Sequence, residues 1–457
     1  MKITQVSISA TQKSTTSGRP ELTPELLAAT AARYSRTNEG LDSILSKIDA
    51  TNPDKSVDTI FKFIDYGHLS IADMAPVAMF LDGISMYAAY YIFSISPQGG
   101  GQESSTRYLK LSPENLMSAS DLGIQEECSW HSRMVSSFKH YSDALAVWEK
   151  VAEEQPHLIR IPTALLSQSS PSARKAVDRI KRNFAFDRAR YYIPLATATN
   201  MMLVQSARCW VEVASHLLSH NLLELNTIGN LIIAELELVT PRLVKHAVAK
   251  PSTSAQIDKR FARQVDAASR SYHIIGAPAH SGVRVQVSMP HDFDARLIHS
   301  SLEDRDNRYS IVGDELCRVS VRFGWEAMTM AEIRDLNRHR TGNKYVPLIP
   351  KGFYGAQDEL PSGLDDIDTE FGSLQSDLAH SKLAAGDACY IYDTLLGTQF
   401  PFEHTTTADK FIYEAELRTG VGSHYRYAQH LREALQAFYV VMPESKGLIM
   451  EGQAEPE

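Results

Sequence analysis

Hydrophobic and polar residues alternate at the start of the chain and then recur at helical spacing. Residues 3–8 alternate apolar and polar side chains, which predicts a β-strand. Thr23-Pro24-Glu25 marks a helix start, with Thr at the N-cap and Pro at the first helical position. Further helices are predicted over residues 42–48 and 55–66, where apolar residues recur every three or four positions.

The most apolar segment, residues 74–96, contains Asp82 as its only charged residue. Asp82-Gly83 divides this segment into a piece of strand length and a piece of helix length. Each piece is too short to cross a bilayer. We therefore expect a buried strand followed by a buried helix, and no membrane span.

Helical spacing dominates the rest of the first half. The predicted helices cover residues 123–155, 174–190, 201–220 and 222–239. Residues 157–173 are rich in Pro and Ser and predict a loop instead.

An internal repeat begins at Val283, where Val-Arg-Val-Gln-Val-Ser-Met alternates as residues 3–8 do. A strand at 319–325 and a helix at 326–338 then follow in the same order as in the first half. The expected division is a first copy over 1–250, a linker over 251–280 and a second, shorter copy over 281–457.

Composition is that of a soluble globular protein. The 457 residues, 43% of them hydrophobic, can bury a large core and favour at least two domains. A formal charge of -9 and a pI near 6.0 argue against binding nucleic acid through bulk positive charge. Cys128, Cys209, Cys317 and Cys389 lie far apart and are expected to be reduced core residues. The N-terminus lacks the apolar block of a signal peptide, so we expect a cytoplasmic protein.

Two stretches contain the candidate chemistry. Residues 99–111 combine glycines and hydroxyl side chains with a single arginine. Backbone N–H groups of such a turn, together with a bidentate guanidinium, suit a phosphate dianion. Residues 334–345 are basic, and we expect them to supply cations to the same site from the second copy.

The combination of three motifs resembles the flavin-dependent thymidylate synthases. These motifs are Ala31-Ala32-Arg33-Tyr34-Ser35, Gly67-His68-x-Ser70 and Glu103-x-Ser105-x-Arg107-Tyr108. The resemblance covers most of residues 20–240, and in the second half it is confined to Arg338-His339-Arg340 with the preceding strand and helix. It implies an α+β fold, with two copies of a helix-rich domain that has a small mixed or antiparallel sheet.

The same resemblance implies an activity and its cofactors. The reaction would be methylation of C5 of a uridine nucleotide, dUMP to dTMP, with methylenetetrahydrofolate as carbon donor and FAD relaying hydride from NADPH. Implied substrate-binding residues are Gly101, Gln102, Glu103, Ser104, Ser105, Arg107, Arg190 and Arg338. Implied cofactor-binding residues are Ser35, His68, Ser70, Asp73, Arg208, Arg338, His339 and Arg340. Arg190, Arg338 and His339 are the expected catalytic residues, and no metal is expected.

Departures from the family pattern indicate a fused pair with complementary losses. The first copy has Phe93-Ser94-Ile95 where Arg-His-Arg is expected, and the second copy lacks the acidic and serine positions after Arg340. Each copy would then keep one side of a shared site, and two chains would form a homodimer equivalent to the family's homotetramer. Leu217 replaces a family arginine that binds the nucleotide, and Arg418 or Arg426 of the second copy are the alternative suppliers.

Several residues also have a purely structural interpretation. Arg107 suits an exposed pair with Glu103, and Arg338 to Arg340 suit a helix C-terminus. His216 and His220 stand four apart, as metal ligands do, but a place at the edge of the core is the preferred interpretation. The rival functions are a non-catalytic or substrate-shifted nucleotide- or flavin-binding protein, and a modifier of uracil within a nucleic acid.

Overall fold

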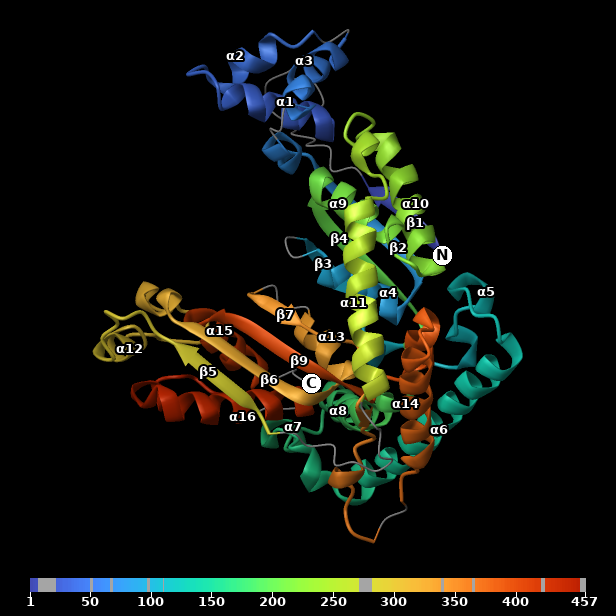
Figure 1. Ribbon diagram of the computed structural model, residues 1–457. Coiled ribbons are helices and arrows are strands. Elements are labelled where there is room, and N and C mark those ends of the chain that lie inside the picture. The colour runs from blue at the N-terminus through green and yellow to red at the C-terminus, as the bar shows by residue number, and fades with distance from the viewer. Residues whose placement is uncertain are drawn as a thin grey trace. The chain divides into compact units, whose positions relative to one another are not determined.

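The computed structural model describes residues 1–6, 22–49, 52–65, 69–96, 99–109, 111–270, 282–337, 341–363, 366–420 and 424–452. Internal contacts divide the chain into two compact units (Figure 1). Unit 1 contains Met1–Ser105, Met117–Gln125 and Thr197–Ala262, and unit 2 contains Thr106–Leu116, Glu126–Ala196 and Arg263–Glu457. Each unit has its own antiparallel sheet, and the fold is α+β, as expected.

The sheet of unit 1 has the strand order β1-β2-β4-β3. Its strands are β1 (Lys2–Val6), β2 (Pro76–Ser85), β3 (Gly100–Glu103) and β4 (Ala198–Ser206). β2 has an irregularity between Leu81 and Ile84 and then continues directly into helix α4 (Met86–Ser94), whose N-terminus is capped by the Ser85 hydroxyl.

The remaining helices of unit 1 are α1 (Pro24–Tyr34), α2 (Leu41–Ser46), α3 (Asp54–Asp65), α5 (Ala119–Leu122), α9 (Ala207–Leu218) and α10 (Leu223–Val239), with 3-10 turns η1 (Leu69–Met74) and η6 (Val244–His246). The side chain of Thr23 caps α1 and Pro24 occupies its first turn, as predicted. Buried Glu25 on α1 accepts a 2.9 Å hydrogen bond from the Arg242 backbone N–H, which ties α1 to the segment before η6.

The sheet of unit 2 has the strand order β5-β6-β9-β7, with β8 also paired to β9. These strands are β5 (Arg284–Ser288), β6 (Ser320–Thr329), β7 (Asn343–Tyr345), β8 (Gly352–Phe353) and β9 (Thr398–Thr407). Helix α13 (Met330–Asn337) follows β6 directly, as α4 follows β2.

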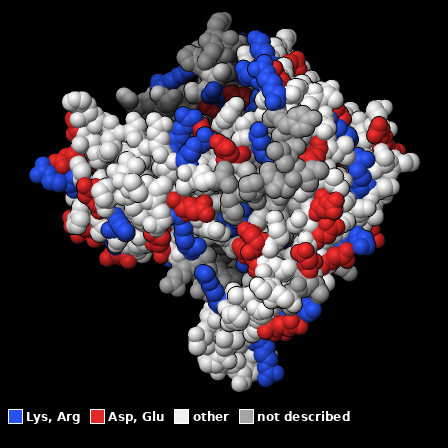
Figure 2. Space-filling model, turned by 60° about the horizontal axis from the view of Figure 1, so that its bottom comes forward, with Lys and Arg blue, Asp and Glu red and all other residues white. Residues whose placement is uncertain are grey.

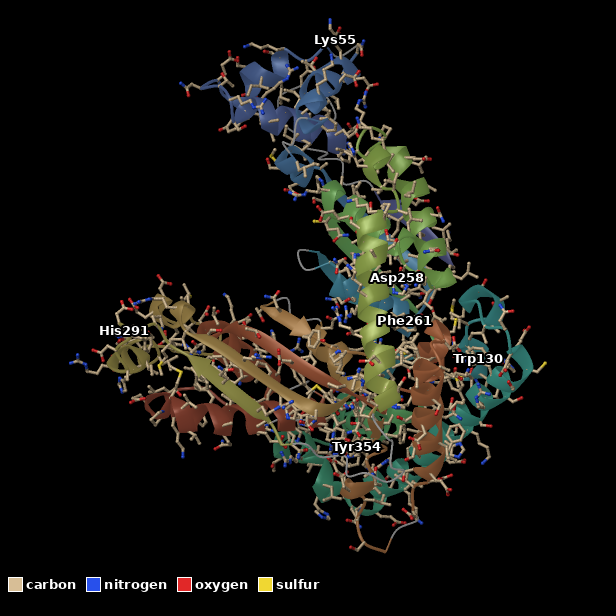
Figure 3. The ribbon with its side chains drawn as sticks, viewed as in Figure 1. Lys55, Trp130, Asp258, Phe261, His291 and Tyr354 are labelled. Carbon is tan, nitrogen blue, oxygen red and sulfur yellow. The ribbon has the colours of Figure 1, made fainter. Side chains whose placement is uncertain are left out.

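Unit 2 also contains further helices and 3-10 turns. They are α6 (Glu127–Glu154), α7 (Thr163–Leu166), α8 (Pro171–Ala189), α12 (Arg296–Ser300), α14 (Glu370–Ala384), α15 (Ala408–Arg418) and α16 (Tyr425–Val441), with 3-10 turns η2 (Thr106–Tyr108), η3 (Pro113–Asn115), η4 (Pro156–Ile159), η5 (Arg190–Tyr192), η7 (Asp314–Arg318), η8 (Gln357–Glu359), η9 (Ala388–Asp393) and η10 (Pro443–Ser445). α6 packs along α8, and the indole N–H of Trp130 on α6, labelled in Figure 3, donates to the Tyr392 carbonyl.

The two sheets repeat one topology, which supports the predicted duplication. In the first sheet Pro76 pairs with Ser206, and in the second Ser320 pairs with Thr407. The irregularity in β2 between Leu81 and Ile84 recurs in β6 between Trp325 and Met328. From these matched positions, the counterpart of Arg338-His339-Arg340 in the first copy is Ser94-Ile95-Ser96. The sequence comparison placed it one residue too early, at Phe93.

A self-complementary contact joins equivalent segments of the two copies within unit 2. The Leu195 N–H donates to the Thr394 carbonyl at 3.0 Å, and the Leu396 N–H donates to the Ile193 carbonyl at 2.8 Å. Pro194 and Leu395 form the antiparallel bridge at its centre. Each segment thus donates one backbone hydrogen bond to the equivalent segment and accepts the corresponding bond from it. This reciprocal pairing is typical of a two-fold contact between like elements.

Two helices predicted from the sequence are corrected. The predicted helix 201–220 is strand β4 followed by α9, and the helix predicted from residue 326 begins at Met330 because β6 extends to Thr329. The described part of the predicted linker is helix α11 (Pro251–Arg270). Residues 126–196 of the first predicted copy pack in unit 2, so the compact units differ from the two copies.

The cysteines and the apolar segment also have clear outcomes. All four cysteines are free, but Cys128 and Cys317 are exposed and Cys209 and Cys389 are half-buried, so the expectation of core positions was wrong. Among the described residues, no helix has the length and hydropathy needed to cross a membrane.

Candidate functional site

A buried ion pair lies where α8 ends in unit 2. Asp187, in the last turn of α8, accepts hydrogen bonds from Arg107 Nε at 3.0 Å and from Nη2 at 2.6 Å. Both side chains are largely buried, at 14% and 9% exposure. Burial acts to raise the pKa of Asp187, but the charges of Arg107 and Arg190 outweigh it and hold the pKa below its usual range. The carboxylate therefore stays ionised at neutral pH.

Arg190 extends this cluster toward the second copy. Its Nη2 lies 3.1 Å from Oδ2 of Asp335, on α13, and Arg190 is 7% exposed. The Nε atom of Arg190 is buried and has no hydrogen-bond partner among the described residues. Arg107 and Arg190, both predicted from the sequence, are thus brought together around Asp187.

His424 closes the cluster from the segment before α16. Its Nε2 lies 3.3 Å from the backbone carbonyl of Asp187, and the residue is 3% exposed. Burial and the charge of Arg190 lower the pKa of His424 to about 4, so the ring is neutral at pH 7. In the part of the chain that the structure describes, its Nδ1 has no hydrogen-bond partner.

A second buried charged group, centred on Glu332, lies next to Tyr191. The Tyr191 hydroxyl is 3.1 Å from that of Tyr425 and 3.4 Å from Glu332, on α13. Glu332 is fully buried and forms ion pairs with Arg426 at 3.4 Å and His430 at 3.3 Å. Burial acts to raise the pKa of Glu332, but these two neighbours outweigh it and lower the pKa to about 2.

Aromatic rings hold two further guanidinium groups. Arg188 lies 3.8 Å from the ring centroid of Phe184 and 4.0 Å from that of Tyr425. Arg426 lies 3.5 Å from the ring centroid of Tyr354, which is labelled in Figure 3. Such stacking stabilises a buried cation without neutralising it. We call the set of Arg107, Asp187, Arg190, Asp335 and His424 the arginine cluster.

Unit 1 contains the predicted cofactor-binding residues that the structure describes. Arg208 lies 3.0 Å from Asp73 and 3.1 Å from Glu212, and Ser70 and Asp73 belong to exposed positions of η1. Ser35 is exposed at the C-terminus of α1, where its hydroxyl donates to Ala32.

A pocket of about 370 Å³ lies beside η1 and Arg208. Its apolar walls come from Leu69, Ala72, Val211, Leu243 and Val248, and its polar groups come from Arg208, Glu212, Lys245, His246 and Lys250. The pocket has the apolar walls and the cations that a nucleotide cofactor requires.

The predicted phosphate loop is a strand in its first part. Gly100–Glu103 form β3, the edge strand of the first sheet, and the Ser104 N–H donates to the Asn200 carbonyl. A side chain at Gly101 would collide with Leu203 and the Met202 carbonyl, so packing against β4 accounts for this glycine. Gln102 is exposed, Ser105 is half-buried, and buried Glu103 lies 3.5 Å from the Thr199 hydroxyl. Ser105 ends the first segment of unit 1, whereas Arg107 belongs to unit 2.

His68 and Arg338-His339-Arg340 lie outside the described residues, so their predicted roles stay predictions. The described residues contain no cluster of His, Cys, Asp or Glu suited to a metal ion. The Tyr91 hydroxyl lies 2.9 Å from Nε2 of His216, and the ring of His220 packs edge-on against Tyr91. This packing fits the preferred interpretation of the two histidines.

Residues 21–242 match a family model described as thymidylate synthase complementing protein. This match covers 222 of the 457 residues. A UPF0159 protein of Chlamydia pneumoniae is 22% identical over 371 residues, covering 70% of this chain and 69% of that protein. Among solved structures, a UMP/dUMP methylase, PolB, from Streptomyces cacaoi bound with 5-Br dUMP matches with 14% identity and a TM-score of 0.30, covering 54% of this chain and 94% of that chain. The family-model match over residues 21–242 confirms the resemblance stated from the sequence.

The fold assigns the register that the sequence left open in the second copy. Because Ser206 and Thr407 occupy equivalent strand positions, buried Leu217 on α9 corresponds to Arg418 on α15. β3 and β7 are likewise equivalent strands of the two copies. Their pairing makes Val346, Leu348 and Pro350 the positions of the second copy that correspond to Glu103, Ser105 and Arg107. The second copy has therefore lost all three side chains of that motif.

Sequence reasoning missed the carboxylates and the histidine of the arginine cluster. Asp187 could have been suspected, because Asp-Arg-Ala-Arg closes a predicted helix with three charges in four residues. Asp335 and His424 gave no such signal, since their partners lie 145 and 237 residues away.

Proposed function

We propose that this protein is a flavin-dependent thymidylate synthase-like methyltransferase that methylates C5 of a uridine nucleotide, dUMP to dTMP. Methylenetetrahydrofolate would supply the carbon and NADPH the reducing equivalents. The single observation that carries the proposal is the arginine cluster, in which Arg107 and Arg190 of the family-matched half meet Asp335 and His424 of the second half.

The arginine cluster suits a nucleotide monophosphate. Two guanidinium groups held by carboxylates are oriented in advance, so binding requires little additional ordering of their side chains. Arg107 would hold the phosphate, and Arg190 would hold the pyrimidine and stabilise negative charge on its carbonyl oxygens as C5 reacts. Both copies would then contribute to one site, with Arg338 and His339 as further predicted contributors.

The pocket of unit 1 fits the nucleotide part of FAD. Its apolar walls suit the adenine ring, and Arg208, Lys245 and Lys250 provide cations for the diphosphate. Ser70 and Asp73 on the adjoining turn would hydrogen-bond the cofactor, as would Ser35. Bound flavin supplies hydride chemistry, and the protein contributes binding and electrostatics.

FAD uptake and proton release test the proposal. The purified full chain should bind FAD, seen as quenched flavin fluorescence, and Arg208→Ala should weaken that binding. With FAD, NADPH and methylenetetrahydrofolate, it should release the C5 proton of dUMP, and Arg190→Lys should slow this release by roughly 100-fold, because a bidentate guanidinium is lost. An unchanged rate in Arg190→Lys, or no FAD uptake, would refute the assignment.

The second candidate function is a nucleotide- or flavin-binding protein without methyl transfer. It is favoured by the engagement of Arg107 with Asp187 through two hydrogen bonds and by Leu217 in place of the family arginine. FAD and dUMP would then bind without any release of the C5 proton.

The predicted partners follow from the same proposal. The functional form would be a homodimer equivalent to four domains, acting in the cytoplasm on a small nucleotide. On the face shown in Figure 2, Lys and Arg side chains are interspersed with Asp and Glu, which supports a small anionic substrate rather than a nucleic-acid polymer.

A further inference from the structure

Two polar atoms in the arginine cluster have no hydrogen-bond partner among the residues that the structure describes: Nε of Arg190 and Nδ1 of His424. The two residues are only 7% and 3% exposed. A buried polar group left without a partner costs about 1–3 kcal/mol, and such groups are uncommon in folded proteins. Two of them in one cluster indicate that a ligand completes their hydrogen bonding.

The hydrogen-bonding character of each atom follows from its surroundings. Nε2 of His424 lies 3.3 Å from the Asp187 carbonyl, which can only accept, so Nε2 carries the hydrogen. The ring is neutral, which leaves Nδ1 as an acceptor. Nε of Arg190 always carries a hydrogen and is a donor. The cluster therefore presents one unused donor and one unused acceptor, on residues from different copies.

We propose that this donor and acceptor bind the imide edge of the pyrimidine, so that His424 is a specificity-determining residue for uracil. Arg190 Nε donates to a ring carbonyl, and His424 Nδ1 accepts the N3–H. This assignment rests on the proposed function, because it takes a uridine nucleotide as the ligand.

The chemistry of the two pyrimidines explains why this edge is selective. Uracil presents a carbonyl oxygen beside N3–H, which matches one donor and one acceptor. Cytosine presents an amino group beside an unprotonated N3, so it would place donor against donor and acceptor against acceptor. A site built to hydrogen-bond a group rejects the analogue that lacks it far more strongly than an apolar pocket does.

The cluster reaches solvent at two of its members. The side chain of Asp335 is 23% exposed and that of Arg107 is 14% exposed. In the proposed complex Arg107 contacts the phosphate of the nucleotide, and Arg190 and His424 contact its base.

Binding of N3-methyl-dUMP tests the assignment directly, because the methyl group replaces the N3–H and leaves the charge of the ligand unchanged. By isothermal titration calorimetry, the full wild-type chain should bind dUMP roughly 10- to 100-fold more tightly than N3-methyl-dUMP or dCMP. In His424→Ala this ratio should fall to within a few-fold. His424→Asn, whose side-chain oxygen can replace the Nδ1 acceptor, should retain most of it.

His380→Asn is the matched control. His380 is another buried histidine of unit 2, hydrogen-bonded to the carbonyls of Pro350 and Ala268, and its loss should leave the ratio unchanged. The inference is overturned if wild type binds N3-methyl-dUMP as tightly as dUMP, or if folded His424→Ala keeps the wild-type ratio. Failure to bind dUMP or UMP at all would overturn the proposed function as well, whereas a His424-dependent ratio without methyl transfer would overturn the proposed function alone.

Discussion

Replacing Asp187 by Asn should lower the free energy of unfolding of unit 2 by more than the loss of an exposed ion pair does. The substitution removes the charge that neutralises Arg107, whose Nε and Nη2 lie 3.0 and 2.6 Å from the carboxylate oxygens. Because Asp187 is 6% exposed, Arg107 would remain buried beside an uncharged amide. Breaking a buried pair on one side typically costs about 3–5 kcal/mol.

Urea unfolding followed by tryptophan fluorescence can measure this loss. Trp130, Trp148 and Trp325 belong to unit 2 and Trp210 to unit 1, so most of the signal reports on unit 2. The control is Glu153→Gln, which removes an exposed pair with Lys181 between α6 and α8. Glu153 is 70% exposed, so this change should cost less than about 1 kcal/mol.

The pH dependence of the Asp187→Asn effect has a defined sign. Because the pKa of Asp187 is lowered in the folded state, its stabilisation is present above the unfolded pKa near 4 and is lost as the pH falls through the folded value. The difference between wild type and Asp187→Asn should therefore be largest at neutral pH and shrink below about pH 4. A loss no greater than that of Glu153→Gln at pH 7 would refute the reasoning.

Three further outcomes are expected. Titration of His424 should cost unit 2 about 3 kcal/mol of stability as the pH falls from 6.5 to about 4. In this range the unfolded His424 gains a proton, whereas the buried ring, which faces Arg190, Asp187, Asp335 and Glu332, does not. His424→Asn should abolish that loss in urea titrations at different pH values. Gly372→Ala should destabilise by about 1–3 kcal/mol in the same assay, since its methyl group would collide with the Phe353 ring. Gly282→Ala should be nearly neutral, because no atom of the described residues lies within 4 Å of the new methyl. Alkylation followed by mass spectrometry should modify exposed Cys128 first and Cys389 last, because burial raises the pKa of the Cys389 thiol to about 11; equal rates would contradict the burial of Cys389.

The sequence was most informative where one periodicity was unambiguous. β1 and β5 formed where alternation predicted strands, β2 formed where a short apolar run predicted one, and α1 began at its predicted cap. β4 was missed because Met201 to Val204 are all apolar, which hides the alternation of buried and half-buried positions along the strand.

The candidate site was predictable in its cations and not in their partners. Arg107 and Arg190 were identified through short motifs, which the sequence displays directly. Asp187 lies 80 residues from Arg107 along the chain, and packing alone decides that they meet. The phosphate-binding role of Gly100 to Glu103 stays a prediction, and the close approach of β3 to β4 gives Gly101 a second, structural explanation.

The bridge between Pro194 and Leu395 has a consequence for the order in which the chain folds during synthesis. Its two halves are separated by roughly 200 residues, which a ribosome adds in about 10 to 40 s at 5–20 residues per second. Residues 126–196 belong to unit 2, yet their partners in 263–457 emerge only after the intervening part of unit 1. During that interval the apolar faces of α6 and α8 remain exposed, because their partners in unit 2 have not yet been synthesised. We therefore expect the newly made chain to depend on chaperones until its second half has left the ribosome.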